Sequence, residues 1–151
     1  MKMNRRHAMA MSAGAVVFAA TGLSSTRALA TAEDVDKAMM QLGGGKMPEA
    51  GKVTLTAPEI AENGNTVPIS VEVDSAMSDG DMVSSVTIYA EGNPNPDVVT
   101  FNFSAMSGTA TASTRMRLAK TQNVVAVAKM ADGSTYMDKK EVKVTIGGCG
   151  G

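Results

Sequence analysis

The sequence predicts an all-β domain of the immunoglobulin-like sandwich class, with a short helix before it and a flexible glycine-rich arm after it. From residue 53 onward, apolar residues alternate with polar ones, which is the period of a strand with one buried face. Turn-forming residues separate these runs at short intervals, as in a sandwich of short strands. Residues 31–42 instead repeat their apolar positions every three or four residues, which is the period of a helix.

Residues 1–30 have the three parts of an export signal: a basic start, a short Ala-rich apolar stretch and an Ala-x-Ala end. We therefore expect cleavage after Ala30. The apolar stretch, 8–23, is shorter than the roughly 20 residues that a membrane-spanning helix needs, so no membrane insertion is expected. Arg5 and Arg6 resemble the pair of a twin-arginine signal, which indicates a folded, periplasmic protein. The alternative is an amphipathic helix that stays in the mature chain.

Loss of this segment limits the chemistry of the chain. Four of the 14 Lys and Arg residues lie in it, which leaves 10 against 15 acidic residues, a net charge of −5. Its only His, His7, is lost too, so residues 31–151 cannot form a Ser-His-Asp or Cys-His unit. One Cys makes neither an internal disulfide nor a thiolate zinc site. We therefore expect no catalytic residue, no metal, no cofactor and no nucleic-acid partner.

Residues 31–52 are expected to be a short helix and a Gly-rich linker. Thr31 is the predicted N-cap and Gly43 the predicted stop, and the acidic residues of the first turns suit the helix dipole. The apolar stripe consists of Val35, Ala38, Met39 and Leu42. We expect this stripe to dock on the domain of its own chain.

Residues 53–146 form the predicted sandwich. The alternating runs lie at 67–73, 86–90, 99–103, 110–118, 124–130 and 142–146. The run 124–130 is apolar at both alternating sets of positions, which predicts a strand buried on both faces. Asp132-Gly133 predicts a hairpin after it, and residues 92–96 are expected to be a surface turn.

The chain ends in Gly147-Gly148-Cys149-Gly150-Gly151, with its only Cys between two glycine pairs. Glycine has the widest backbone freedom, so such an arm can thread a narrow pocket with only the thiol projecting. We interpret Cys149 as a site of covalent attachment. The arm offers no His or cation to lower a thiol pKa that starts near ~8.5, so another protein must activate the sulfur. A frayed terminus, or a Cys that only links two chains, is the simpler alternative.

These features resemble those of the SoxY family, the sulfur carriers of periplasmic thiosulfate oxidation. The terminal pentapeptide and the export context are the specific part of the resemblance. Less specific stretches follow in the order of the family at residues 57–64, 90–94, 114–119, 132–134 and 141–146.

The resemblance implies that Cys149 holds thiosulfate-derived sulfur, first as an S-thiosulfonate and then as sulfane sulfur, on an arm of Gly147, Gly148, Gly150 and Gly151. It implies a permanent heterodimer with SoxZ. It also implies transient docking to the c-type cytochrome SoxAX, the thiosulfohydrolase SoxB and, where present, the sulfane dehydrogenase SoxCD. The chain itself would be a carrier and not an enzyme.

Two other functions compete with this one. Ubiquitin-like carriers hold sulfur on a terminal Gly-Gly, so Gly150-Gly151 would be the site, although an export signal argues against their cytoplasmic activation. An exported immunoglobulin-like interaction module would use Cys149 only for an intermolecular disulfide. Arg115 and Arg117 alternate with apolar residues and form either an anion-attracting patch or the solvated face of a strand.

Overall fold

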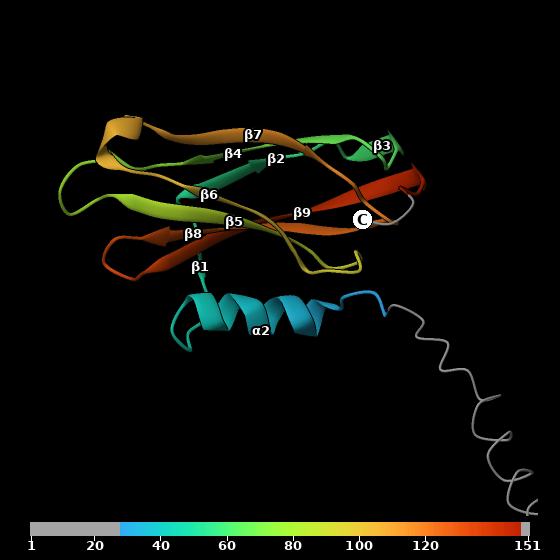
Figure 1. Ribbon diagram of the computed structural model, residues 1–151, viewed down its shortest axis with the longest axis horizontal. Helices are drawn as coiled ribbons and strands as arrows, with labels where there is room; N and C mark the ends of the chain where they lie inside the picture. Colours follow the sequence, from blue (N-terminus) through green and yellow to red (C-terminus); the bar gives the residue numbers. More distant parts are fainter. Residues whose placement is uncertain (1–27, 149–151) are drawn as a thin grey trace, which may run out of the picture.

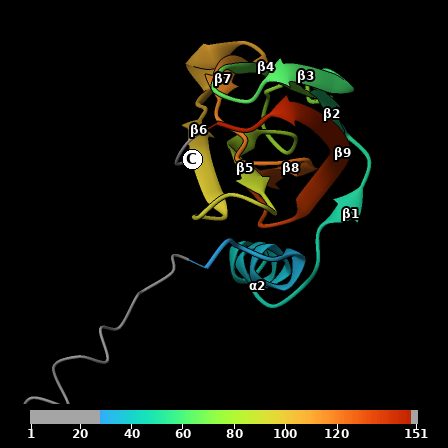
Figure 2. The same ribbon diagram turned by 90° about the vertical axis from the view of Figure 1, so that its right-hand side faces the viewer.

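In the computed structural model of the chain, residues 28–148 are described, and two β-sheets pack face to face with a helix outside the larger sheet (Figures 1 and 2). The predicted signal residues Arg5 and Arg6 and the tail residues 149–151 lie outside the described part. No helix within the described part is long and apolar enough to cross a membrane.

Helix α2, Ala32–Leu42, comes first in the described chain. The strands follow as β1 Glu49–Ala50, β2 Val53–Thr56, β3 Ile60–Asn63, β4 Val67–Val73, β5 Val83–Ala90, β6 Asp97–Asn102, β7 Ala110–Met116, β8 Gln122–Met130 and β9 Thr135–Ile146. A single 3-10 turn, η1 Ala105–Ser107, precedes β7. The mainly β fold that the alternating runs predicted is confirmed.

The larger sheet has the order β1-β9-β8-β5-β6, with β3 also paired to β9, and the smaller sheet has the order β2-β4-β7. Most neighbours are antiparallel, but β1 and β3 both run parallel to β9, one near its start and one near its end. The sequence did not predict these two parallel pairings. The immunoglobulin-like classification stays a prediction.

The core between the sheets comes from the alternation that the sequence shows. In β4, the residues that point inward are apolar and buried, and those between them are more exposed. In β8 both faces are buried: Val124, Ala126 and Ala128 join the core between the sheets, while Val125 and Val127 point to the other side. The strand predicted to be buried on both faces is therefore confirmed.

Helix α2 covers that other side of β8 (Figure 2). Val35 and Met39 are fully buried against Tyr89, Val125 and Val127, so the apolar stripe docks on its own domain as expected. Burial raises the pKa of the Tyr89 phenol above its usual value, and the negative charge of Asp97 raises it further.

Both ends of α2 form as predicted. The Asp34 N–H donates to Thr31 Oγ1 at 3.3 Å, and the Thr31 N–H donates to Asp34 Oδ2 at 3.0 Å, which is a reciprocal capping box. The Thr31 N–H, and next the Thr31 hydroxyl that donates to Asp34 Oδ2 at 2.9 Å, lower the pKa of the Asp34 carboxyl. Gly43 is the C-cap. The segment after it is more than a linker, because Glu49 and Ala50 pair with Tyr136 and Met137 of β9.

The docking of α2 gives a stability test. Met39 is 1% exposed and its neighbour Met40 is 42% exposed. We expect Met39→Ala to lower the free energy of unfolding by about 2–4 kcal/mol, because it leaves a cavity under the helix. Met40→Ala removes the same atoms from an exposed position and should cost less than about 0.5 kcal/mol. Urea unfolding of both variants measures the difference, and equal losses would contradict the docked helix.

Candidate functional site at the root of the C-terminal tail

The tail that carries the predicted site continues from the end of β9. Two connections lie at the same end: the turn between β3 and β4 and the segment between β7 and β8 (Figure 1). Gly147 is exposed there, whereas Gly148 is buried. The tail therefore does not leave the domain at Ile146.

Backbone hydrogen bonds link the three segments in series. The Gly64 N–H donates to the Ile146 carbonyl oxygen at 2.7 Å, and the Leu118 N–H donates to the Gly64 carbonyl oxygen at 2.8 Å. The Gly148 N–H then donates to the Leu118 carbonyl oxygen at 2.9 Å. Ile146 and Gly148, on either side of Gly147, are thus bonded to the backbone of Gly64 and Leu118.

Only glycine fits at this junction. A Cβ atom on Gly64 would lie less than 3.0 Å from the Leu118 carbonyl oxygen, and one on Gly147 equally close to the Ala119 carbonyl oxygen. A Cβ atom on Gly148 would lie 2.8 Å from the carbonyl oxygen of Gly64. All these neighbours are backbone atoms, which cannot rotate away as a side chain can. Glycine serves here for close backbone approach.

A buried pair of amide side chains holds the segment between β7 and β8 in place. Asn93 is 4% exposed and Gln122 is 7% exposed. The Asn93 Nδ2 donates to the Arg117 carbonyl oxygen at 2.8 Å, and Asn93 Oδ1 accepts from the Ala119 N–H at 3.0 Å. The Gln122 Nε2 also donates to Asn93 Oδ1, at 3.0 Å, and Gln122 Oε1 accepts from the Gly92 N–H at 2.7 Å.

The expected surface turn at residues 92–96 is therefore wrong at its start, because Gly92 and Asn93 are buried in this network. The exposed end of the loop shares a hollow of about 390 Å³ with Arg115 and Arg117. Both arginines are exposed, and neither forms an ion pair with another residue of the described part. The acidic side chain of Asp97 lines the same hollow, and exposure of both arginines agrees with the solvated face of a strand as well as with an anion-attracting patch.

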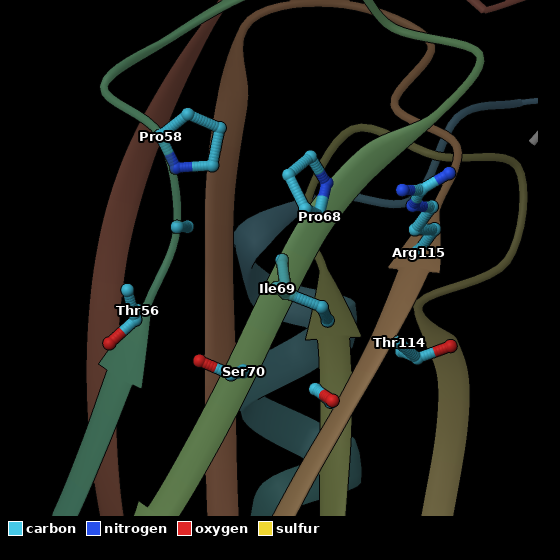
Figure 3. Close-up of a pocket in the computed structure, with 9 residues that line it drawn as sticks. Thr56, Pro58, Pro68, Ile69, Ser70, Thr114 and Arg115 are labelled. Carbon is cyan, nitrogen blue, oxygen red and sulfur yellow. The ribbon is translucent and has the colours of Figure 1, made fainter.

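Another hollow, with a volume of about 560 Å³, lies on the outer face of the smaller sheet (Figure 3). Thr56, Ser70 and Ser113 stand in register across β2, β4 and β7 on its floor. Arg115 lies at its edge beside Pro68 (Figure 3). Neither Gly147 nor Gly148, the two tail residues that the structure describes, lines this hollow, so it does not identify the site.

Of the predicted site residues, Gly147 and Gly148 are placed, while Cys149, Gly150 and Gly151 lie outside the described residues. The sequence did not indicate Gly64, Asn93 or Gln122, which hold the root of the tail. Within residues 28–148, no three His, Cys, Asp or Glu side chains are grouped as a metal site would need.

Comparison with known families decides what kind of protein carries this tail. The family described as sulfur oxidation protein SoxY matches residues 39–149, a range that ends on Cys149. The chain belongs to the SoxY family.

A solved SoxY sulfur carrier protein from Chlorobium limicola f thiosulfatophilum is 34% identical, with a TM-score of 0.61 over 77% of this chain and 100% of the other. The fold also resembles the superoxide reductase (neelaredoxin) of Ignicoccus hospitalis, at 17% identity and a TM-score of 0.55 over 77% and 94% of the two chains. The superoxide reductase of Nanoarchaeum equitans is 13% identical, with a TM-score of 0.52 over 63% of this chain and 99% of the other. These two likenesses show the fold alone. Comparison with curated proteins finds no match.

The amide network can be tested through Asn93. We expect Asn93→Ala to lower the free energy of unfolding of this SoxY-family protein by about 2–3 kcal/mol, because it leaves buried polar groups of Gln122 and the 117–119 backbone unpaired. Asn95→Ala, an exposed position in the same loop, should change it by less than about 0.5 kcal/mol. Urea unfolding measures both, and a loss for Asn93→Ala as small as that for Asn95→Ala would show that the network does not hold the loop.

Proposed function

We propose that this protein is a periplasmic carrier that covalently holds thiosulfate-derived sulfur on Cys149 and presents it to the enzymes of sulfur oxidation. The observation that carries the proposal is the SoxY family match, which extends to Cys149, the only Cys of the chain. The relative from Chlorobium is a sulfur carrier by its title. The basic, Ala-rich leader supports export, and its paired arginines support the twin-arginine route.

The proposed cycle begins with an oxidative coupling. The outer sulfur of thiosulfate forms an S–S bond with Cys149 Sγ, the thiol proton leaves, and two electrons pass to a c-type cytochrome, SoxAX. Water then cleaves the bond between the sulfane sulfur and the sulfonate. Sulfate and a proton leave, and Cys149 keeps the sulfane sulfur as a persulfide. The thiosulfohydrolase SoxB catalyses this step. SoxCD, where present, oxidises the remaining sulfur with oxygen from water, and this oxidation releases protons and passes electrons to a c-type cytochrome.

The chain contributes attachment and presentation, not catalysis. Residues 31–151 contain no His to act as a general base. The partner enzymes therefore supply the activating groups. SoxZ is the permanent partner, and export of the folded pair allows SoxZ to cross without a signal of its own.

Cargo on Cys149 is tested by the intact mass of the protein from the periplasm of cells supplied with thiosulfate. We expect a mass increase that a thiol reductant removes, mapped to the C-terminal peptide, on a chain that begins at Thr31. Cys149→Ser should carry no such mass. A sulfur load that survives this substitution would instead support a terminal Gly150-Gly151 carrier.

The interaction-module alternative is tested by a deletion. We expect removal of residues 149–151 to abolish thiosulfate-dependent respiration, because the sulfur has no attachment site, while folding and SoxZ binding persist. Growth rate, thermal unfolding and co-purification with SoxZ measure the three properties. Respiration that continues in the truncated strain would show that the tail serves only to link chains.

A further inference from the structure

The first glycine pair of the tail is held by the domain, whereas a flexible arm that began at Ile146 would leave both glycines free to move. Gly148 is buried, its N–H is bonded to the Leu118 carbonyl oxygen, and its Cα faces the Gly64 backbone without room for a side chain. We infer that Gly64 and the Leu118–Ala119 peptide form a seat for Gly147-Gly148, and that Gly64 is a positioning residue for the carrier thiol. This inference rests on the proposed function of Cys149.

The seat sets where the sulfur is attached. A tail free from Ile146 would let the Cys149 Cα travel roughly 10 Å from the end of β9, at about 3.3–3.6 Å per extended residue. With Gly148 in the seat, the Cys149 Cα lies ~3.8 Å from a fixed Cα. The point from which the thiol departs is then a defined position on the surface of the domain.

The surroundings of the seat are built to keep this position. Leu118 is fully buried. Its N–H donates to the Gly64 carbonyl oxygen, and its carbonyl oxygen accepts from the Gly148 N–H. The residues on either side of it, Arg117 and Ala119, are held by the Asn93 side chain. On the other side, the Gly64 N–H is bonded to the carbonyl oxygen of Ile146. Leu118 and Ala119, which contact the tail glycines, are thus held by further hydrogen bonds to Gly64 and to the Asn93 side chain.

A fixed departure point determines how partner enzymes approach. An enzyme that acts on the sulfur carried by Cys149 must meet the end of the domain formed by residues 63–66, 92–96 and 117–120, since the thiol starts from there. Positioning of a reacting group before binding reduces the entropy lost on association. Release of Gly147-Gly148 from the seat would therefore weaken binding of the loaded protein to the enzyme without altering the reactivity of the thiol itself.

The seat can be measured without any substitution. In the full-length protein purified with SoxZ, we expect the Gly148 amide hydrogen to exchange at least about tenfold more slowly than the same amide in a free peptide of residues 145–151. Exchange at the peptide rate would show that the seat is not occupied in solution, and would overturn the inference whatever Cys149 carries.

The function of the seat is tested with Gly64→Ala and with a control away from this end of the domain, Thr111→Ala, whose side chain is exposed near the start of β7. We expect Gly64→Ala to remove the protection of Gly148 and to raise KM of the thiosulfohydrolase for the loaded protein about fivefold, with kcat within about twofold. Thr111→Ala should change neither value. The rate at which a small thiol reagent modifies Cys149 should stay within about twofold in both variants.

A Gly64→Ala variant that loses Gly148 protection but keeps the KM of the control would show that the seat does not position the thiol. If that variant fails to fold, Gly148→Ala, which places its clash on the tail side of the same contact, takes its place in the same assays. Failure of the carrier function is distinct from both outcomes, since no loaded protein would then form while the slow exchange of Gly148 would remain.

Discussion

The pairing of β9 with β8 is the interaction on which the rest of the fold depends. β9 runs antiparallel to β8 from Thr135 to Val142, and its other edge accepts β1 near the start and β3 near the end, both in parallel. The Asp138 side chain, from the middle of β9, accepts the Leu55 N–H of the smaller sheet at 2.9 Å. One strand therefore joins the helix-bearing segment, both sheets and the tail.

The elements with a strong period could be predicted from the sequence, and the short ones could not. The runs at 67–73 and 124–130 and the helix between Thr31 and Gly43 are fixed by local pattern and capping, and the structure has them where the sequence indicated. β1 and β3 have two and four residues, and their side chains are mostly exposed. Such segments have no readable period, and they become strands only because β9 passes beside them.

The candidate site, too, could be predicted from the sequence only in part. The glycine pairs and Cys149 are conspicuous in the sequence, and the family match ends on that Cys. The seat could not be predicted, because Gly64 and Gly148 lie far apart in the sequence and meet only in the folded domain. Their contact produces no pattern in either segment. The sequence predicts a surface turn at Asn93 because Asn is common in turns, whereas its side chain is buried in the amide network. The likeness to superoxide reductases shows the fold alone, so function here is argued from the family and the tail rather than from the sandwich.

The order of the strands along the chain has a consequence for biosynthesis. The strand that supplies partners to β1, β3 and β8 is the last of the described strands to be made. Contacts between distant parts of the sequence must wait until both partners exist. While the ribosome still covers β9, the strands β1, β3 and β8 lack this neighbour, and the larger sheet cannot close. The larger sheet is therefore completed only after every other strand of the domain has been made.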